Sequence, residues 1–106
     1  MLFCMLTIER LAGDRGVTLI LRGALDGPGA RRLQDALPRE EEAAGRLTLD
    51  LARVDCVTAA GLRVLLGHFR AGGAGTVLRA PRPPVHRLLD VAGLTRLYPV
   101  EAGGAR

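Results

Sequence analysis

The spacing of apolar residues changes repeatedly along this chain, and this change constrains the fold more than any single motif does. The segment 47–51, Leu-Thr-Leu-Asp-Leu, alternates strictly, which predicts a half-buried strand. Leu62, Leu65, Leu66 and Phe69 instead follow the i, i+3, i+4, i+7 spacing of an amphipathic helix. Segments of the two kinds that take turns along a chain favour an α/β fold, in which helices pack on a sheet.

Local signals predict further strands and helices on either side of these segments. Segments 6–11 and 17–21 are β-rich and flank a turn at 13–16, so we expect a hairpin. Asp26-Gly27-Pro28 and Pro83-Pro84 each mark a helix start, because proline is tolerated in the first helical turn. We also expect short strands at 76–78 and 98–100, an apolar stripe of Val85, Leu88, Leu89 and Ala92 on the last helix, and a left-handed Gly93 after it.

Length and composition favour one compact domain and argue against several functional classes. The chain has 106 residues, 48% of them hydrophobic, which is enough for one core. No apolar run approaches the roughly 18 residues of a membrane span, and the opening apolar run lacks the features of a signal peptide. We therefore expect a cytoplasmic protein without direct membrane insertion. The net charge is only +4, the basic residues are spread along the chain, and aromatic residues are scarce, so we expect no nucleic-acid binding.

Residues that carry enzyme chemistry are sparse. The chain contains no serine and no GxGxxG, P-loop, HExxH or GxSxG motif. Cys4 and Cys56 lack metal-ligand spacing, so we expect small buried side chains rather than a disulfide, a metal site or a nucleophile. His68 and His86 fall on the polar sides of expected helices and should be solvated. We therefore expect no enzyme activity, no cofactor and no metal ion.

Three blocks of sequence carry a resemblance to a known family. They are 21–26 (LRGALD), 49–62 (LDLARVDCVTAAGL) and 84–94 (PVHRLLDVAGL). Together, in this order, they resemble the signature of STAS domains, which include the bacterial anti-anti-sigma factors, also called anti-sigma factor antagonists. The resemblance implies a single STAS-like domain over residues 1–100, with a mixed sheet of four or five strands and about three helices packed on it. Residues 101–106 should form a frayed tail.

The resemblance also implies a switch. In the family, a kinase partner phosphorylates a serine at the start of the second helix, and this breaks the complex. Here Thr58 stands at the family's aspartate, and Ala59 stands at its phosphoacceptor. Three interpretations remain open: Thr58 is an N-cap whose oxygen accepts from the N–H of Ala60 or Gly61, Thr58 is a displaced phosphoacceptor, or the protein is a constitutive binder that cannot be phosphorylated at Ala59. We favour the N-cap for Thr58 and the constitutive binder as the consequence of Ala59.

The partner implied by the resemblance is an anti-sigma factor that is also a serine/threonine kinase, bound by a monomer or a weak dimer of this chain. Two alternatives remain: the STAS subunit of a membrane transporter complex, which binds the ATPase subunit, and a scaffold component of a larger assembly. Asp26 and Gly61 also have simpler structural roles, in helix capping and in close packing of a helix on the sheet. The expected partner-binding residues are Asp26, Val57, Thr58, Ala59, Ala60, Gly61, Leu62 and Arg63.

Overall fold

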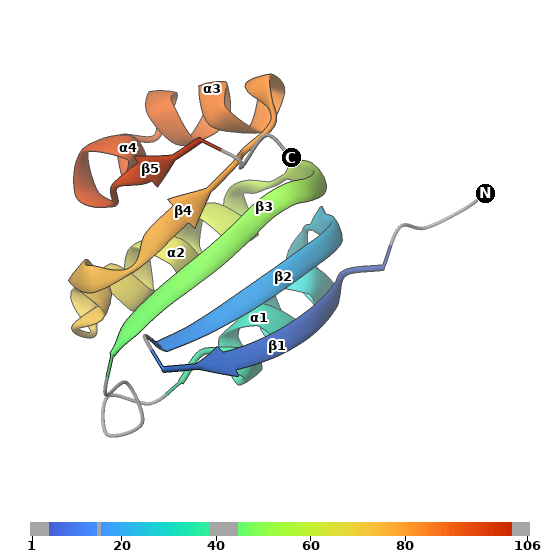
Figure 1. Ribbon diagram of the computed structural model, residues 1–106. Coiled ribbons are helices and arrows are strands. Elements are labelled where there is room, and N and C mark those ends of the chain that lie inside the picture. Colours follow the sequence, from blue (N-terminus) through green and yellow to red (C-terminus); the bar gives the residue numbers. More distant parts are fainter. Residues whose placement is uncertain (1–4, 15, 39–44, 103–106) are drawn as a thin grey trace.

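The computed structural model describes residues 5–14, 16–38 and 45–102, which form one sheet with helices packed beside it (Figure 1). This part of the chain contains five strands, four α-helices and one 3₁₀ helix. In chain order they are β1 (Thr7–Gly13), β2 (Gly16–Leu25), α1 (Gly27–Ala36), β3 (Arg46–Val57), α2 (Ala59–Arg70), η2 (Gly73–Gly75), β4 (Val77–Arg79), α3 (Pro83–Val91), α4 (Leu94–Leu97) and β5 (Val100–Glu101).

The strands lie in the sheet in the order in which they occur along the chain, β1-β2-β3-β4-β5. β1 is antiparallel to β2, and all other neighbours are parallel. Each parallel connection advances to the next strand in the same direction, so right-handed crossovers place their helices on one face of the sheet. Figure 1 shows α1 and α2 together behind the sheet. The expected hairpin and mixed sheet are confirmed, and the four-residue α4 adds to the three expected helices.

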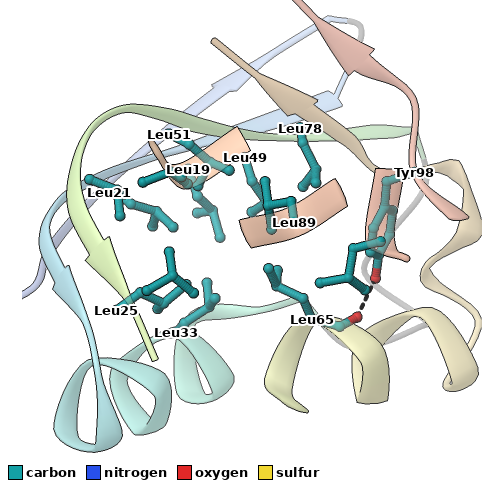
Figure 2. Packing of buried hydrophobic residues seen from close by; sticks show 14 of the residues in the cluster. Leu19, Leu21, Leu25, Leu33, Leu49, Leu51, Leu65, Leu78, Leu89 and Tyr98 are labelled. Carbon is teal, nitrogen blue, oxygen red and sulfur yellow. Dashed lines mark hydrogen bonds between the residues drawn. The ribbon is translucent and has the colours of Figure 1, made fainter. Parts of the chain in front are cut away.

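The core lies between this face of the sheet and the helices. Alternate residues of the central strands point into it, and Leu19 of β2 and Leu49 of β3 are at most 1% exposed. Leu33 of α1 and Leu65 of α2 meet them from the helical layer (Figure 2). The strict alternation of segment 47–51 therefore marks the central strand of the fold, as predicted.

β3 is longer than the sequence pattern predicted. The strand expected at 47–51 is the first part of a strand that continues to Val57. β3 carries one extra residue relative to β2 at two places, and each β-bulge shifts the side-chain alternation by one. Val54 and Val57 therefore both point inward although they are three residues apart. The residue pairs that bracket the two bulges are Ile20–Asp50 and Arg22–Arg53, then Gly23–Val54 and Ala24–Cys56.

The bulges also explain why one prediction about the cysteines is wrong. Cys56 is exposed and free, whereas we expected a buried side chain. It follows the second bulge, so it faces solvent next to the exposed Asp55 instead of continuing the inward alternation. Cys4 lies outside the described residues.

The apolar stripe predicted on α3 is only half correct. Val85 and Leu89 are buried as expected, but Leu88 is 43% exposed and Ala92 is also exposed. The following helix supplies the reason, because Leu94 at the start of α4 packs in the same core cluster as Val85 and Leu89. Only the side of α3 that carries Val85 and Leu89 is therefore buried in the core.

The chain after α3 follows the predicted turn. Gly93 has a φ of 80°, in the left-handed region, as its place just beyond the helix predicted. The last strand begins later than expected, at Val100, and pairs with β4. The tail expected from residue 101 onward includes Glu101 of this strand, and residues 103–106 lie outside the described part.

Tyr98, which follows α4, ties this end of the chain to α2. Its hydroxyl donates a hydrogen bond of 2.6 Å to the carbonyl oxygen of Leu65 (Figure 2). The Tyr98 ring is 1% exposed, and burial raises the pKa of Tyr98 to about 12, so the hydroxyl keeps its proton at neutral pH. The Phe69 ring meets the Tyr98 ring edge to face, with 5.6 Å between the ring centroids.

His68 is half-buried, so the prediction of a solvated side chain is wrong for it, while His86 is exposed as expected. The His68 ring stacks on Tyr98, and its Nε2 lies 2.9 Å from Oγ1 of the buried Thr76. Helical periodicity placed His68 opposite the apolar stripe, but the segment that returns from α2 to β4 covers this side of the helix. Burial lowers the pKa of His68 below its ordinary value, because the charged ring is poorly solvated there.

We expect this histidine to make the fold less stable in mild acid. With a folded-state pKa below the unfolded value of about 6.5, protons bind the unfolded chain first as the pH falls. The stability that the neutral ring contributes is therefore complete above about pH 7 and is lost as the pH falls through about 6.5 toward the folded-state pKa. Urea unfolding of the wild type and of His68→Gln at pH 7.5, 6.5 and 5.5 measures this loss. The wild type should lose more free energy of unfolding over this range than the variant, and parallel curves would contradict the assignment.

Candidate functional site

The candidate site lies where β2 and β3 end side by side. Leu25 pairs with Val57 at the ends of these strands. The next residue of each strand, Asp26 and Thr58, is the N-cap of the helix that follows. The amino ends of α1 and α2 therefore meet at one edge of the sheet, and the positive ends of both helix dipoles point toward it.

Asp26 caps α1, as predicted. One of its carboxylate oxygens accepts a hydrogen bond of 2.9 Å from the N–H of Gly29. Asp26 itself is half-buried, and Pro28 occupies the first helical turn. The carboxylate therefore has a structural partner, while part of its surface stays open to solvent.

Thr58 occupies the N-cap position of α2, but the capping hydrogen bond that we predicted for its side chain is absent. Its Oγ1 instead lies 3.5 Å from the carbonyl oxygen of Leu25, to which it donates a long hydrogen bond. The same oxygen accepts the backbone N–H of Thr58 at 3.1 Å. The hydroxyl is thus turned back toward the strand end, and the first turn of α2 has neither a side-chain cap nor an acidic residue.

Gly61 allows α2 to sit directly on the end of β2. A Cβ atom built at Gly61 would lie 2.6 Å from the carbonyl oxygen of Leu25 and 2.7 Å from its Cγ. Neither atom is the end of a flexible side chain, so a larger residue would push α2 away from the strand. The close-packing role expected for Gly61 is therefore confirmed.

The predicted partner-binding residues divide into an exposed group and a supporting group. Thr58, Ala59 and Arg63 are exposed, whereas Val57 and Gly61 are buried and shape the site from below. Ala60, Leu62 and Asp26 are half-buried. The structure thus brings all eight residues to one edge, but only part of the set offers side chains to a partner.

The outer side of α2 continues this surface and includes a residue that the sequence analysis did not single out. Arg63, Gly67 and Arg70 are exposed along it. Nothing lies within 4 Å of a Cβ atom built at Gly67, so packing does not require a glycine there. A glycine inside a helix costs about 1 kcal/mol relative to alanine. A glycine in the middle of the predicted helix is therefore unusual, and the sequence alone could have marked Gly67 as a position to examine.

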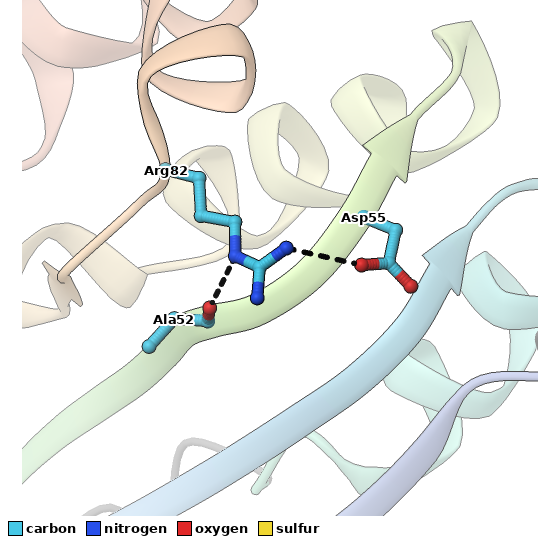
Figure 3. Close-up of polar contacts among 3 residues, drawn as sticks. All are labelled: Ala52, Asp55 and Arg82. Atoms are coloured by element: carbon cyan, nitrogen blue, oxygen red, sulfur yellow. Dashed lines mark hydrogen bonds and ion pairs between the residues drawn. The ribbon is translucent and has the colours of Figure 1, made fainter.

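Arg82 fixes the start of α3 against β3 (Figure 3). Its Nε donates to the carbonyl oxygen of Ala52 at 2.9 Å, and its Nη1 lies 3.4 Å from Oδ1 of Asp55. Both charged side chains are about half exposed, so water screens the pair and its energy is small. Sequence reasoning missed this contact, because no local pattern relates residues 27 positions apart.

No group of histidine, cysteine, aspartate and glutamate side chains among the described residues could hold a metal ion. None of the helices that the structure describes is long and apolar enough to cross a membrane. An open hollow of about 510 Å³ lies at the amino ends of β2 and β3, away from the candidate site, and its lining includes Thr18, Arg46, Thr48, Arg79 and Glu101.

A family model described as "Mlab, STAS domain" matches residues 9–99. The chain belongs to the STAS family. The resemblance in the three sequence blocks, and the fold that it implied, are therefore confirmed.

Curated relatives of this STAS domain are named for one function. The anti-sigma factor antagonist BtrV of Bordetella bronchiseptica is 28% identical over 99 residues, which cover 90% of this chain and 84% of that protein. The anti-sigma F factor antagonist of Paenibacillus polymyxa is 32% identical over 95 residues, covering 81% of this chain and 79% of the relative. The chain is thus an anti-sigma factor antagonist-like STAS domain.

Solved structures share its fold. Unphosphorylated SpoIIAA, an anti-sigma factor antagonist, has a TM-score of 0.76 at 20% identity and covers 93% of this chain and 90% of its own. Phosphorylated SpoIIAA from Bacillus has a TM-score of 0.68 at 19% identity, with coverages of 94% and 92%. An anti-sigma factor antagonist from Mycobacterium paratuberculosis reaches 0.79 at 21% identity, covering 91% and 85%. At these identities the likeness concerns the fold alone.

Two glycines of α2 should respond in opposite ways to alanine. Gly61→Ala should lower the free energy of unfolding by about 1–3 kcal/mol, because the new methyl group meets the carbonyl of Leu25. Gly67→Ala is the matched control in the same helix and should raise stability by up to about 1 kcal/mol, because the site is open. Urea titration followed by circular dichroism measures both. Equal effects of the two substitutions would contradict the seating of α2 on β2.

Proposed function

We propose that this STAS domain is a non-enzymatic regulator of the anti-sigma factor antagonist kind, and that its partner is an anti-sigma factor that is also a serine/threonine kinase. The names of its curated relatives support the class of partner. One observation on this chain carries the proposal. The exposed start of α2, at Thr58 and Ala59, lies beside Asp26 at the edge where β2 and β3 end.

We further propose that the complex is constitutive. SpoIIAA exists in phosphorylated and unphosphorylated forms. In this chain Ala59 stands at the position of the family's acceptor serine, and it has no hydroxyl to modify. The neighbouring hydroxyl, of Thr58, is engaged with the carbonyl oxygen of Leu25. A kinase would have to break that contact and turn the side chain outward before it could use Thr58.

The physical consequence of an alanine at this position is the loss of a charge switch. A phosphoryl group adds roughly −1.5 to −2 charges, and at a helix start the free N–H groups and the dipole tolerate such a charge in the unbound protein. In a contact surface the same charge must be desolvated against the partner, which weakens the complex. With Ala59 the surface keeps one charge state, so regulation would act on the amount of protein or on the partner.

The lost acceptor also fits an alternative. A STAS subunit that binds the ATPase subunit of a membrane transporter would have no need of a phosphorylation site. Capture of the tagged full chain from its own cells, with mass spectrometry of the eluate, separates the two. An anti-sigma factor with a kinase domain supports the proposal, whereas a transporter ATPase or a large enzyme assembly in its place supports the alternatives.

The position of the contact surface can be tested in the same experiment. Asp26→Arg should weaken capture of the partner by about tenfold or more, because it places a long cation between the two helix starts. Asp14→Arg makes the same charge change in the exposed turn between β1 and β2 and serves as the control. Since Asp26 also caps α1, circular dichroism must show that the variant is folded. Equal capture by both folded variants would mean that the surface lies elsewhere.

Restoring the hydroxyl should restore the switch. Incubated with the captured kinase and ATP, Ala59→Ser should gain phosphate at residue 59 and release the partner, while the wild type should stay unmodified. Mass spectrometry of the intact chain and its peptides measures both. Phosphate on Thr58 of the wild type would contradict a constitutive complex and make Thr58 a displaced acceptor.

A further inference from the structure

Positive charge is divided unequally between the two layers of this domain. Among the described residues, the four α-helices carry six arginines and two aspartates, an excess of four positive charges. The strands and the connecting segments carry six arginines and six carboxylates, with no excess. The helix arginines are Arg31, Arg32, Arg63, Arg70, Arg87 and Arg96, and the helix aspartates are Asp35 and Asp90.

The ion pairs follow the same division. The three that join described residues use Arg22, Arg46 and Arg82, which lie on strands or in the connection before α3. All six helix arginines are exposed. The strands and connecting segments thus carry no net charge, while the helices present a net positive charge to solvent.

α2 lies near the middle of this positive surface. It packs next to α1 in the helical layer (Figure 1). Arg63 and Arg70 stand two helical turns apart, which is about 10 Å along the axis. Gly67 lies between them, one turn after Arg63, and leaves the helix surface low there, so another chain can approach the helix backbone between the two guanidinium groups.

We propose that the outer side of the helical layer, centred on Arg63 and Arg70, docks an acidic segment of the partner protein. The proposal rests on the proposed function in one respect only, since it names the chemistry of the partner at the same helix. Guanidinium groups bind carboxylates through two parallel hydrogen bonds, which orients the partner as well as attracting it. Opposite charge on the two surfaces also raises the rate of encounter.

A protein fits this surface better than the other polyanions do. A single-stranded nucleic acid needs stacking platforms, but the aromatic side chains of the described part, Phe69 and Tyr98, are half-buried and buried. A helix that lies on an anionic membrane needs a broad apolar side, and the outer side of α2 carries arginine, alanine and glycine.

Matched charge reversals test the proposal. Arg63→Glu/Arg70→Glu and the control Arg10→Glu/Arg53→Glu change the net charge equally, the first on α2 and the second on exposed sheet positions. Each tagged full chain captures partners from its own cells, and affinity for the principal captured protein is then measured with purified components at rising sodium chloride. The helix variant should bind at least tenfold more weakly, the control should bind like the wild type, and wild-type affinity should fall with salt. Hydrogen exchange on the captured protein should show protection in a segment rich in Asp and Glu.

The outcomes separate this proposal from the proposed function. Capture of a kinase anti-sigma factor that both variants bind equally overturns the acidic docking surface and leaves the proposed function intact. Loss of a different protein by the helix variant alone, with protection in an acidic segment, supports the docking surface and rejects the proposed function. Protection only in a neutral or basic segment overturns the proposal. Binding of the purified chain to phosphatidylglycerol vesicles or to nucleic acid that depends on Arg63 and Arg70 also overturns the proposal, because the ligand of this surface would then be a lipid or a nucleic acid instead of a protein segment.

Discussion

The carbonyl oxygen of Leu25 is the point on which the arrangement of this domain depends. It accepts the N–H of Thr58, lies within reach of the Thr58 hydroxyl, and is the atom that any side chain at Gly61 would strike. One backbone group at the end of β2 therefore sets where β3 ends and how closely α2 approaches the sheet. Because Asp26 is the next residue, the cap of α1 is held beside the cap of α2 by the same contact.

The order of the strands has a consequence for the surface as well as for the core. Sequential parallel strands with right-handed crossovers place their connecting helices on one face of the sheet, as Figure 1 shows for α1 and α2. Charged residues on the strands pair with one another, as Arg46 does with Glu101. The helices turn only one side inward and keep their arginines outward. A topological constraint thus becomes a difference in charge between two faces, on which recognition can act.

The parts of the fold that could be predicted from sequence are those where one short segment decides its own structure. Segment 47–51 and the helix with Leu65 repeat with a clear period, and Gly93 sits where a helix must end. The errors arose where a distant segment decides. Cys56 faces solvent because β3 bulges against β2, and His68 is covered because the chain returns past it to β4. No periodicity within a helix or strand contains that information.

The candidate site shows the same limit at the scale of one residue. The sequence placed a hydroxyl at residue 58 and none at residue 59, and these positions look nearly interchangeable in a one-dimensional pattern. They differ in space, because Thr58 is the extended residue before the helix, with a φ of −103° and a ψ of 177°, and Ala59 is the first helical residue. A hydroxyl at 59 would face solvent, whereas the hydroxyl at 58 faces the end of β2. The spacing of a motif therefore carries function only together with the backbone that orients it.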